Sequence, residues 1–219
     1  MMTYEQNPFQ TQKEKSRPTI QQIKIKDGLD AKQLLWDGLK AYEGESAVWK
    51  PEYDEVVEWL KDNHHKGLML AGNCGQGKTL LAMHILPVIF QNYCEENKDF
   101  YSGGLGDIEV YSAYEMNEIY RREENDNNWG NRKKSRKDLF GKSPIMIDDF
   151  GTETELNIFG EKHMVFSEIV DHAEKNGRML ILTTNLTSDQ IQAHYDMRIR
   201  DRLRYLVKRI GFDGKSLRK

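Results

Sequence analysis

The chain has 219 residues, of which 38% are hydrophobic and 31% are charged, with 32 basic residues against 35 acidic ones. This composition excludes an intrinsically disordered chain and predicts a globular protein with one sizeable core. No apolar run approaches the ~20 residues that a membrane span needs, and the N-terminus lacks the apolar core of a signal peptide. With two cysteines and no cluster of metal ligands, the expected location is the reducing cytoplasm, without a membrane partner.

The N-terminal part of the sequence predicts an arm with one helix. Residues 1 to about 25 are polar and have no sustained periodicity, so we expect them to be mostly extended. From Asp30 to Tyr42 the apolar residues follow helical spacing. A helix this short must bury its apolar stripe on its own domain or on another protein. We therefore divide the chain into an arm, residues 1–46, that could dock a partner, and a core, residues 47–219.

The core begins with a helix, a strand and a second helix. Pro51 occupies the first helical position, and the helix is expected to fade near Asn63. Gly67–Ala71 reads as a buried strand. A mostly apolar helix then runs to about Tyr93, with a kink expected at Pro87.

Between that strand and the second helix lies GNCGQGKT, which has the G-x-x-x-x-G-K-T spacing of a phosphate-binding loop. Glycines let backbone N–H groups curl toward a phosphate at the positive end of a helix. Lys78 would neutralise the β- and γ-phosphates and the Thr79 hydroxyl would hold Mg²⁺; the alternative is a glycine turn that happens to carry Lys-Thr. The predicted nucleotide-binding residues of this stretch are Gly72, Asn73, Cys74, Gly75, Gln76, Gly77, Lys78, Thr79 and Leu80.

The middle of the chain contains a short predicted strand, Ile108–Tyr111, and helical residues from Met116 to Arg121. The stretch from Glu123 to Lys137 is strongly polar. It reads either as an exposed loop or as a loop that contacts DNA phosphates. Its basic residues are Arg132, Lys133, Lys134, Arg136 and Lys137.

Two acidic residues end the next predicted strand, PIMIDD, at Pro144–Asp149. Downstream of a phosphate-binding loop, this pattern is typical of a Walker B segment. Asp148 would hold Mg²⁺ together with Thr79. Asp149 would orient or deprotonate the attacking water. The alternative is a solvated turn after a buried strand.

A helix at Met164–Ala173 and a buried strand at Met179–Thr183 follow. Asn185 stands just beyond the strand, where its amide could bond a γ-phosphate or the attacking water; it could also simply start a loop. Thr187 and Gln190 have the spacing of a capping box and predict a new helix.

Arg198 and Arg202 are four residues apart and share one helical face, from which they could point at a phosphate. The alternative is surface ion pairing, for instance with Asp196 or Asp201. Leu206–Phe212 reads as a last edge strand. From Arg198 onward, nine basic residues stand against two acidic ones, which indicates either a polyanionic partner or a solvated basic helix.

Taken in order, the motifs GNCGQGKT, IMIDDFGTE, LTTNLT, MRIRDRL and GKSLR resemble those of the AAA+ ATPases of the DnaC/DnaI helicase-loader family and of the related IstB transposition helpers. The resemblance covers roughly Trp49 to Arg218, and it includes phage-borne members. The roles that it implies are Walker A for Lys78 and Thr79, Walker B for Asp148 and Asp149, sensor 1 for Asn185, a trans-acting arginine finger for Arg202 with Arg198 as helper, and sensor 2 for Arg218.

The sequence departs from the family in two ways. Only about 45 residues precede the core, and they contain no visible zinc ligands. The sequence therefore does not assign the surface that would dock a helicase. The sequence stops just after Arg218, so a C-terminal helical lid is expected to be minimal or absent. Weak or oligomer-dependent nucleotide binding would follow.

These patterns predict a three-layer α/β P-loop NTPase of the AAA+ type with a mostly parallel five-stranded sheet. The resemblance implies an ATP- and Mg²⁺-dependent helicase loader. It would bind a replicative helicase and single-stranded DNA and would assemble into a ring or filament. The alternatives are an IstB-type transposition helper, a small-molecule P-loop kinase, and a nucleotide-gated DNA-binding module that does not hydrolyse ATP.

Overall fold

The computed structural model describes residues 18–95, 108–121, 135–141, 144–153, 155–158 and 161–213. Its centre is a five-stranded sheet in the order β2-β3-β6-β1-β7, in which every pairing is parallel. The strands are β1 (Gly67–Gly72), β2 (Glu109–Ser112), β3 (Ile145–Asp148), β6 (Leu180–Thr184) and β7 (Val207–Phe212). The predicted five-stranded α/β sheet is confirmed.

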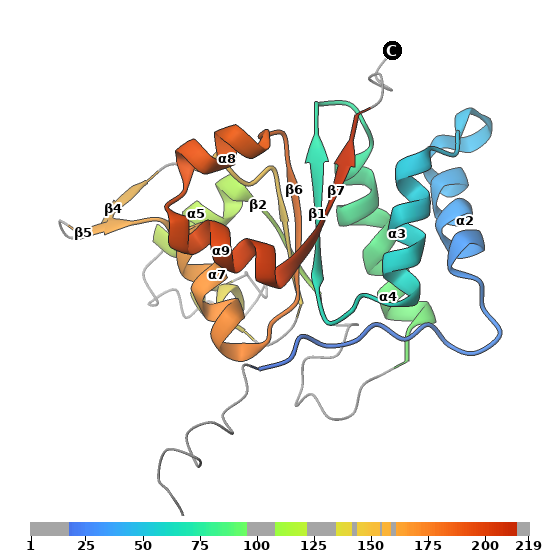
Figure 1. Ribbon diagram of the computed structural model, residues 1–219, viewed down its shortest axis with the longest axis horizontal. Helices are drawn as coiled ribbons and strands as arrows, with labels where there is room; N and C mark the ends of the chain where they lie inside the picture. Colours follow the sequence, from blue (N-terminus) through green and yellow to red (C-terminus); the bar gives the residue numbers. More distant parts are fainter. Residues whose placement is uncertain are drawn as a thin grey trace, which may run out of the picture.

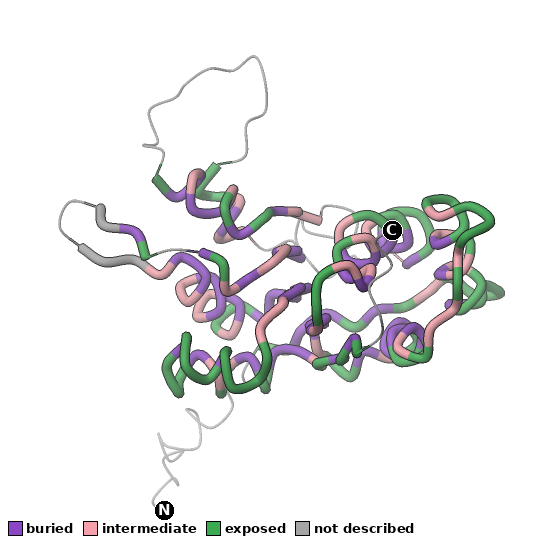
Figure 2. The backbone as a smooth tube through the Cα atoms, turned by 90° about the horizontal axis from the view of Figure 1, so that it is seen from above, coloured by how far each residue is buried: buried purple, intermediate pink, exposed green. Residues whose placement is uncertain are grey.

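Helices cover both faces of this sheet and complete three layers (Figure 1). One face carries α2 (Ala31–Glu43), α3 (Pro51–Lys61) and the helix made of η2 (Leu80–Ile85) and α4 (Leu86–Tyr93). The other carries α5 (Ala113–Arg121), α7 (Val165–Asn176), α8 (Ser188–His194) and α9 (Met197–Leu206). Buried positions follow the strands and the inner sides of the helices (Figure 2). Within the described residues, no helix has the length and hydropathy that a membrane crossing requires.

The helix α2 packs on the protein's own core, one of the two outcomes expected for it. Leu35 and Leu39 are fully buried, and Asp30 caps the helix by accepting a hydrogen bond from the Lys32 N–H. Gly38 permits close contact, since a Cβ there would lie 2.6 Å from the Ile85 side chain. The short 3₁₀ turn η1 (Gly44–Ser46) then leads toward α3. A docking role for residues 1–46 stays a prediction.

Residues 18–30, which precede α2, form no helix and are fastened to the core; the rest of the predicted arm, residues 1–17, lies outside the described residues. Ile20 and Ile23 are buried. The Asn63 side chain, 1% exposed, accepts from the Ile23 N–H and donates to the Gln21 and Lys66 carbonyls, at 2.9 to 3.0 Å. The Ile23 N–H and the Gln21 carbonyl are buried, so the Asn63 side chain gives them the hydrogen-bond partners that water does not.

The helix runs through Pro87, where the sequence predicts a kink, and a π-turn stands before that proline. Residues 80–85 form the π-turn η2, and α4 starts one residue before Pro87. A proline inside a helix has no N–H to donate, and it crowds the carbonyl one turn earlier. A π-turn is one way to take up this misfit, and such turns are frequent at functional sites.

Two further details differ from the predictions. Arg136 and Lys137 belong to a short helix, α6 (Arg136–Leu139), rather than to a loop, because Ser135 and Asp138 form a capping box. The Arg136 guanidinium lies 3.9 Å from the centre of the Tyr120 ring. The rest of the basic cluster, Arg132–Lys134, lies outside the described residues. A two-stranded antiparallel sheet of β4 (Leu156–Ile158) and β5 (Glu161–His163) was not predicted, since this stretch lacks a run of β-branched residues.

Candidate nucleotide-binding site

The glycine loop connects β1 to η2 at the carboxyl edge of the sheet. Gly75 and Gly77 have φ values of 78° and 89°, which favour glycine and allow the loop to curl. Gly72, at the end of β1, pairs with Phe212 of β7. A Cβ on Gly72 would lie 2.1 Å from the Phe212 carbonyl oxygen, so a side chain there would separate the two strands. The loop is therefore fixed to the sheet at its first residue.

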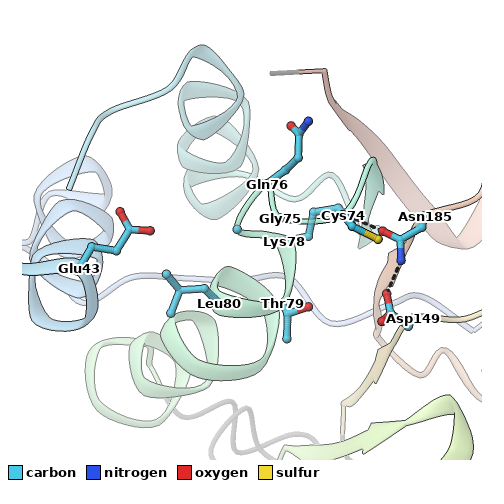
Figure 3. A pocket seen from close by; sticks show the side chains of 10 residues that line it. Glu43, Cys74, Gly75, Gln76, Lys78, Thr79, Leu80, Asp149 and Asn185 are labelled. Atoms are coloured by element: carbon cyan, nitrogen blue, oxygen red, sulfur yellow. Dashed lines mark hydrogen bonds between the residues drawn. The ribbon is translucent and has the colours of Figure 1, made fainter. Parts of the chain in front are cut away.

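Lys78 is the centre of the polar contacts. Its side chain is buried, and its ammonium donates to the carbonyls of Gly72 and Asn73 at 2.8 and 2.9 Å. It also donates to the Asn185 side-chain oxygen at 2.9 Å. The Asn185 amide in turn donates to Asp149 Oδ1 at 3.0 Å (Figure 3). A cation, an amide and a carboxylate from three separate strand ends thus form one chain of hydrogen bonds.

A second cluster of oxygens lies beside the first. Thr79 Oγ1 donates to Asp148 Oδ1 at 3.0 Å, which brings the predicted Mg²⁺ ligands together. Thr183 Oγ1 donates to the same carboxylate oxygen and accepts from the Asp149 N–H at 2.9 Å. Hydroxyl and carboxylate oxygens are the donors that Mg²⁺ prefers, so these residues fit the ion. Thr183 was not predicted as a site residue; a buried hydroxyl inside the apolar strand LILTT was its signal.

Asp149 has a φ of 54°, a left-handed conformation that is uncommon for residues other than glycine. Its backbone is held there by two bonds to β6, from the Asp149 N–H to Thr183 Oγ1 and from the Phe150 N–H to the Thr183 carbonyl at 3.0 Å. Backbone outliers of this kind occur preferentially at functional sites. The turn directs the carboxylate into the pocket, as Figure 3 shows.

The pocket has a volume of about 270 Å³. Most of the predicted residues line it, while Gly72 and Asn73 contribute through their bonds to Lys78. Glu43, at the end of α2, also lines it and was not predicted. Only the packing of α2 on the core brings this residue to the site, so no local pattern reveals it. The lining residues are Glu43, Cys74, Gly75, Gln76, Gly77, Lys78, Thr79, Leu80, Asp149 and Asn185.

Comparisons with known proteins agree with this architecture. No family model and no curated protein matches the sequence. Among solved structures, the DnaC helicase loader is similar over 80% of this chain and 98% of its own, with 16% identity and a TM-score of 0.50. The fold is therefore similar to that of the DnaC helicase loader. A DnaI structure is 18% identical, with a TM-score of 0.47 over 89% of this chain and 88% of its own. A putative primosome component from Streptococcus pyogenes serotype M3 is 13% identical, with a TM-score of 0.48 over 89% and 86%.

The two predicted arginines of this DnaC-like fold lie outside the pocket. Arg198 donates to Asp171 at 2.9 Å, and Arg202 binds both Asp171 and Glu174 of α7. The side chain of Arg202 is 14% exposed. The ion-pairing alternative therefore describes this protomer, although with partners other than the expected Asp196 and Asp201. Arg218 lies outside the described residues.

The turn after Asp149 is tied to the helix pair that carries these arginines. Glu153 accepts hydrogen bonds from the Gly151 N–H and from the Tyr195 hydroxyl, and burial raises the pKa of Tyr195. Phe150 stacks on Phe166 of α7 at 4.8 Å between ring centres. Tyr195 directly precedes Asp196, which is the N-cap of α9. The contacts of Glu153 and Phe150 therefore hold the turn that follows Asp149 against α9.

The two cysteines are expected to react differently. Cys74 is exposed in the pocket, whereas burial raises the pKa of Cys94 to about 12. About one Cys94 thiol in ten thousand is then ionised at pH 8, and the thiolate is the reactive form. In native protein, iodoacetamide should modify Cys74 at least about tenfold faster, as measured by peptide mass spectrometry, and both should react in urea. Equal native rates would contradict the burial of Cys94.

Proposed function

We propose that this protein is an ATP-hydrolysing AAA+ protein of the helicase-loader type, which binds a replicative helicase and single-stranded DNA. The observation that supports it best is the chain of hydrogen bonds from Lys78 through Asn185 to Asp149, beside the contact between Thr79 and Asp148. Groups suited to binding phosphate, holding a metal and activating water thus come from three strand ends and meet at one edge of the sheet. The DnaC-like fold supports the same assignment at the level of architecture.

The polar residues that meet at the pocket have roles that suit their chemistry. The loop N–H groups and the Lys78 ammonium bind the β- and γ-phosphates of ATP. Thr79 and Asp148 would hold Mg²⁺, which neutralises charge on the phosphates. Asp149 accepts a proton from the attacking water, and Asn185 orients that water or the γ-phosphate. The same Asn185 bonds both Lys78 and Asp149, so it fixes the distance between the phosphate-binding and water-activating groups.

Replacing Asp149 by asparagine separates chemistry from binding. The amide would keep the shape of the carboxylate, and its oxygen could still accept the hydrogen bond from Asn185. It could not take a proton, so ATP hydrolysis should fall by about 10²-fold while nucleotide affinity changes little. Steady-state phosphate release and fluorescent-nucleotide titration measure the two quantities. Wild type that binds ATP without turnover, alone or with single-stranded DNA, would favour the non-hydrolysing DNA-binding module instead.

The partner is tested separately from the ATPase activity. A pull-down with purified replicative helicase, with and without ATP, should retain helicase on the immobilised protein. A parallel pull-down with a purified transposase should not. Retention of the transposase alone would favour the IstB-type alternative and leave the ATPase assignment intact.

Arg202 is proposed to act on ATP bound to a neighbouring copy. If so, Arg202→Ala should lower hydrolysis by about 10²-fold at protein concentrations where wild type is assembled. The matched control is Asp171→Asn with Glu174→Gln, which removes the intramolecular partners but keeps the guanidinium. The control should retain turnover if Arg202 acts in trans. Equal losses in both variants would mean that Arg202 only fastens α9 to α7.

A further inference from the structure

The helix α9 carries two pairs of arginines on different faces. Arg198 and Arg202 face α7, where Asp171 and Glu174 neutralise them. Arg200 and Arg204 are also four residues apart, so they share a second face. On that side they line a groove together with Arg209, which comes from the edge strand β7.

The groove lies between α8, α9 and the edge of the sheet formed by β1 and β7, and it encloses about 170 Å³. Figure 1 shows α8 and α9 on this side of the sheet. Four apolar residues form its floor, and each is at most 9% exposed. Ser188 and Gln192 of α8 complete the rim. The floor residues are Met69, Ile191, Leu203 and Val207.

The arginines of the groove are not neutralised within the described part of the chain. The side chains of Arg204 and Arg209 have no hydrogen bond or ion pair there, and Arg200 donates only to the backbone carbonyl of Asp196. Among the same residues, the nearby carboxylates of Asp189 and Asp201 form no ion pair with them. Like charges held close together repel each other, so three guanidinium groups around an apolar hollow favour an anionic ligand.

The character of the floor decides which anion fits. None of the described residues that line the groove is aromatic, so they offer no ring on which a nucleic acid base could stack. An aliphatic side chain matches the floor, and guanidinium groups bind carboxylates through two parallel hydrogen bonds. Both features are satisfied by one class of ligand, a peptide that combines acidic and aliphatic residues.

We propose that the groove between α8, α9 and β7 binds a short acidic segment of a partner protein. An aliphatic side chain of that segment enters the hollow, and its carboxylates pair with Arg200, Arg204 and Arg209. This site is distinct from the nucleotide pocket, since the described residues that line the two do not overlap. The proposal therefore stands independently of ATP hydrolysis.

The test is to pan a display library of random 12-residue peptides on the full chain and to measure the enriched peptides by fluorescence anisotropy. Arg200→Gln with Arg204→Gln removes two charges from the groove. Lys137→Gln with Lys175→Gln removes two charges from exposed positions elsewhere and serves as the matched control. Enriched peptides should combine Asp or Glu with Leu, Ile or Met. Their Kd should rise by about tenfold or more in the groove variant and by less than about twofold in the control.

If the groove instead binds nucleic acid, a second copy of this chain or nothing, the measurements will differ. Each of these outcomes would overturn the proposal. A thymidine 20-mer that competes with the peptides and loses affinity in the same groove variant would make the site one for nucleic acid. Loss of self-association in the groove variant, measured by sedimentation velocity without peptide, would make it a contact between copies. No enrichment, peptides without acidic residues, or equal losses in both variants would show that the groove has no such ligand. Replacing the aliphatic residue of an enriched peptide by serine should also weaken binding, and no loss would exclude the apolar floor from the interaction.

Discussion

Replacing Lys78 by alanine is expected to remove measurable ATP binding and to lower ATP hydrolysis by about 10³-fold or more. The Lys78 ammonium is the charged donor of the loop, and it also holds Asn185 through a 2.9 Å hydrogen bond. Alanine therefore removes the charge that neutralises the phosphates and releases the residue that positions Asp149. Fluorescent-nucleotide titration and phosphate release measure the two losses.

The control for Lys78 is Lys175→Ala, which removes a lysine from an exposed position on α7. This variant should bind and hydrolyse ATP like the wild type. A urea unfolding curve for Lys78→Ala shows whether the loop alone has changed or the whole domain. If Lys78→Ala retained turnover in a folded protein, ATP would have to bind elsewhere, and the assignment of the pocket would be wrong.

Replacing Asn63 by alanine is expected to destabilise the protein by about 3 kcal/mol. The side chain makes three hydrogen bonds to buried or half-buried backbone groups, and each group left without a partner costs about 1–3 kcal/mol. Part of the loss would be recovered where water reaches the Lys66 carbonyl, since Lys66 is only half-buried. The change should appear as a lower midpoint of urea unfolding.

Asn176→Ala is the matched control, because Asn176 is exposed and its amide makes a single bond, to the His172 carbonyl in its own helix. The free energy of unfolding of this control should differ from that of the wild type by less than about 0.5 kcal/mol. Equal effects of the two substitutions would mean that the Asn63 bonds do not hold the N-terminal segment to the core.

The sequence was sufficient for features that depend on neighbouring residues. The strand at Gly67, the capping box at Thr187 and the acidic pair at Asp148 and Asp149 each have a local pattern, and their strands end at one edge because the sheet is parallel. Once two strands pair in parallel, residues just after them must lie close together. This is why Asn185 could be placed beside the loop.

Contacts between distant segments could not be predicted from the sequence. Glu43 reaches the pocket only through the packing of α2, and Arg202 finds Asp171 and Glu174 on a helix about thirty residues earlier. The pairing of Arg202 with α7 rather than with aspartates of its own helix depends on the angle between the two helices, which no spacing encodes. The π-turn before Pro87 likewise depends on how the surrounding residues absorb a missing donor.

The fastening of the N-terminal segment also determines where the chain can be trimmed. A fragment that starts at Ala31 would keep every helix and strand of the three layers but would lose Ile20 and Ile23, whose burial contributes about 1.5–3 kcal/mol each. It would also leave the Asn63 amide facing water. A fragment that starts at Pro18 keeps all of these contacts, so its midpoint of urea unfolding should be higher than that of the fragment that starts at Ala31.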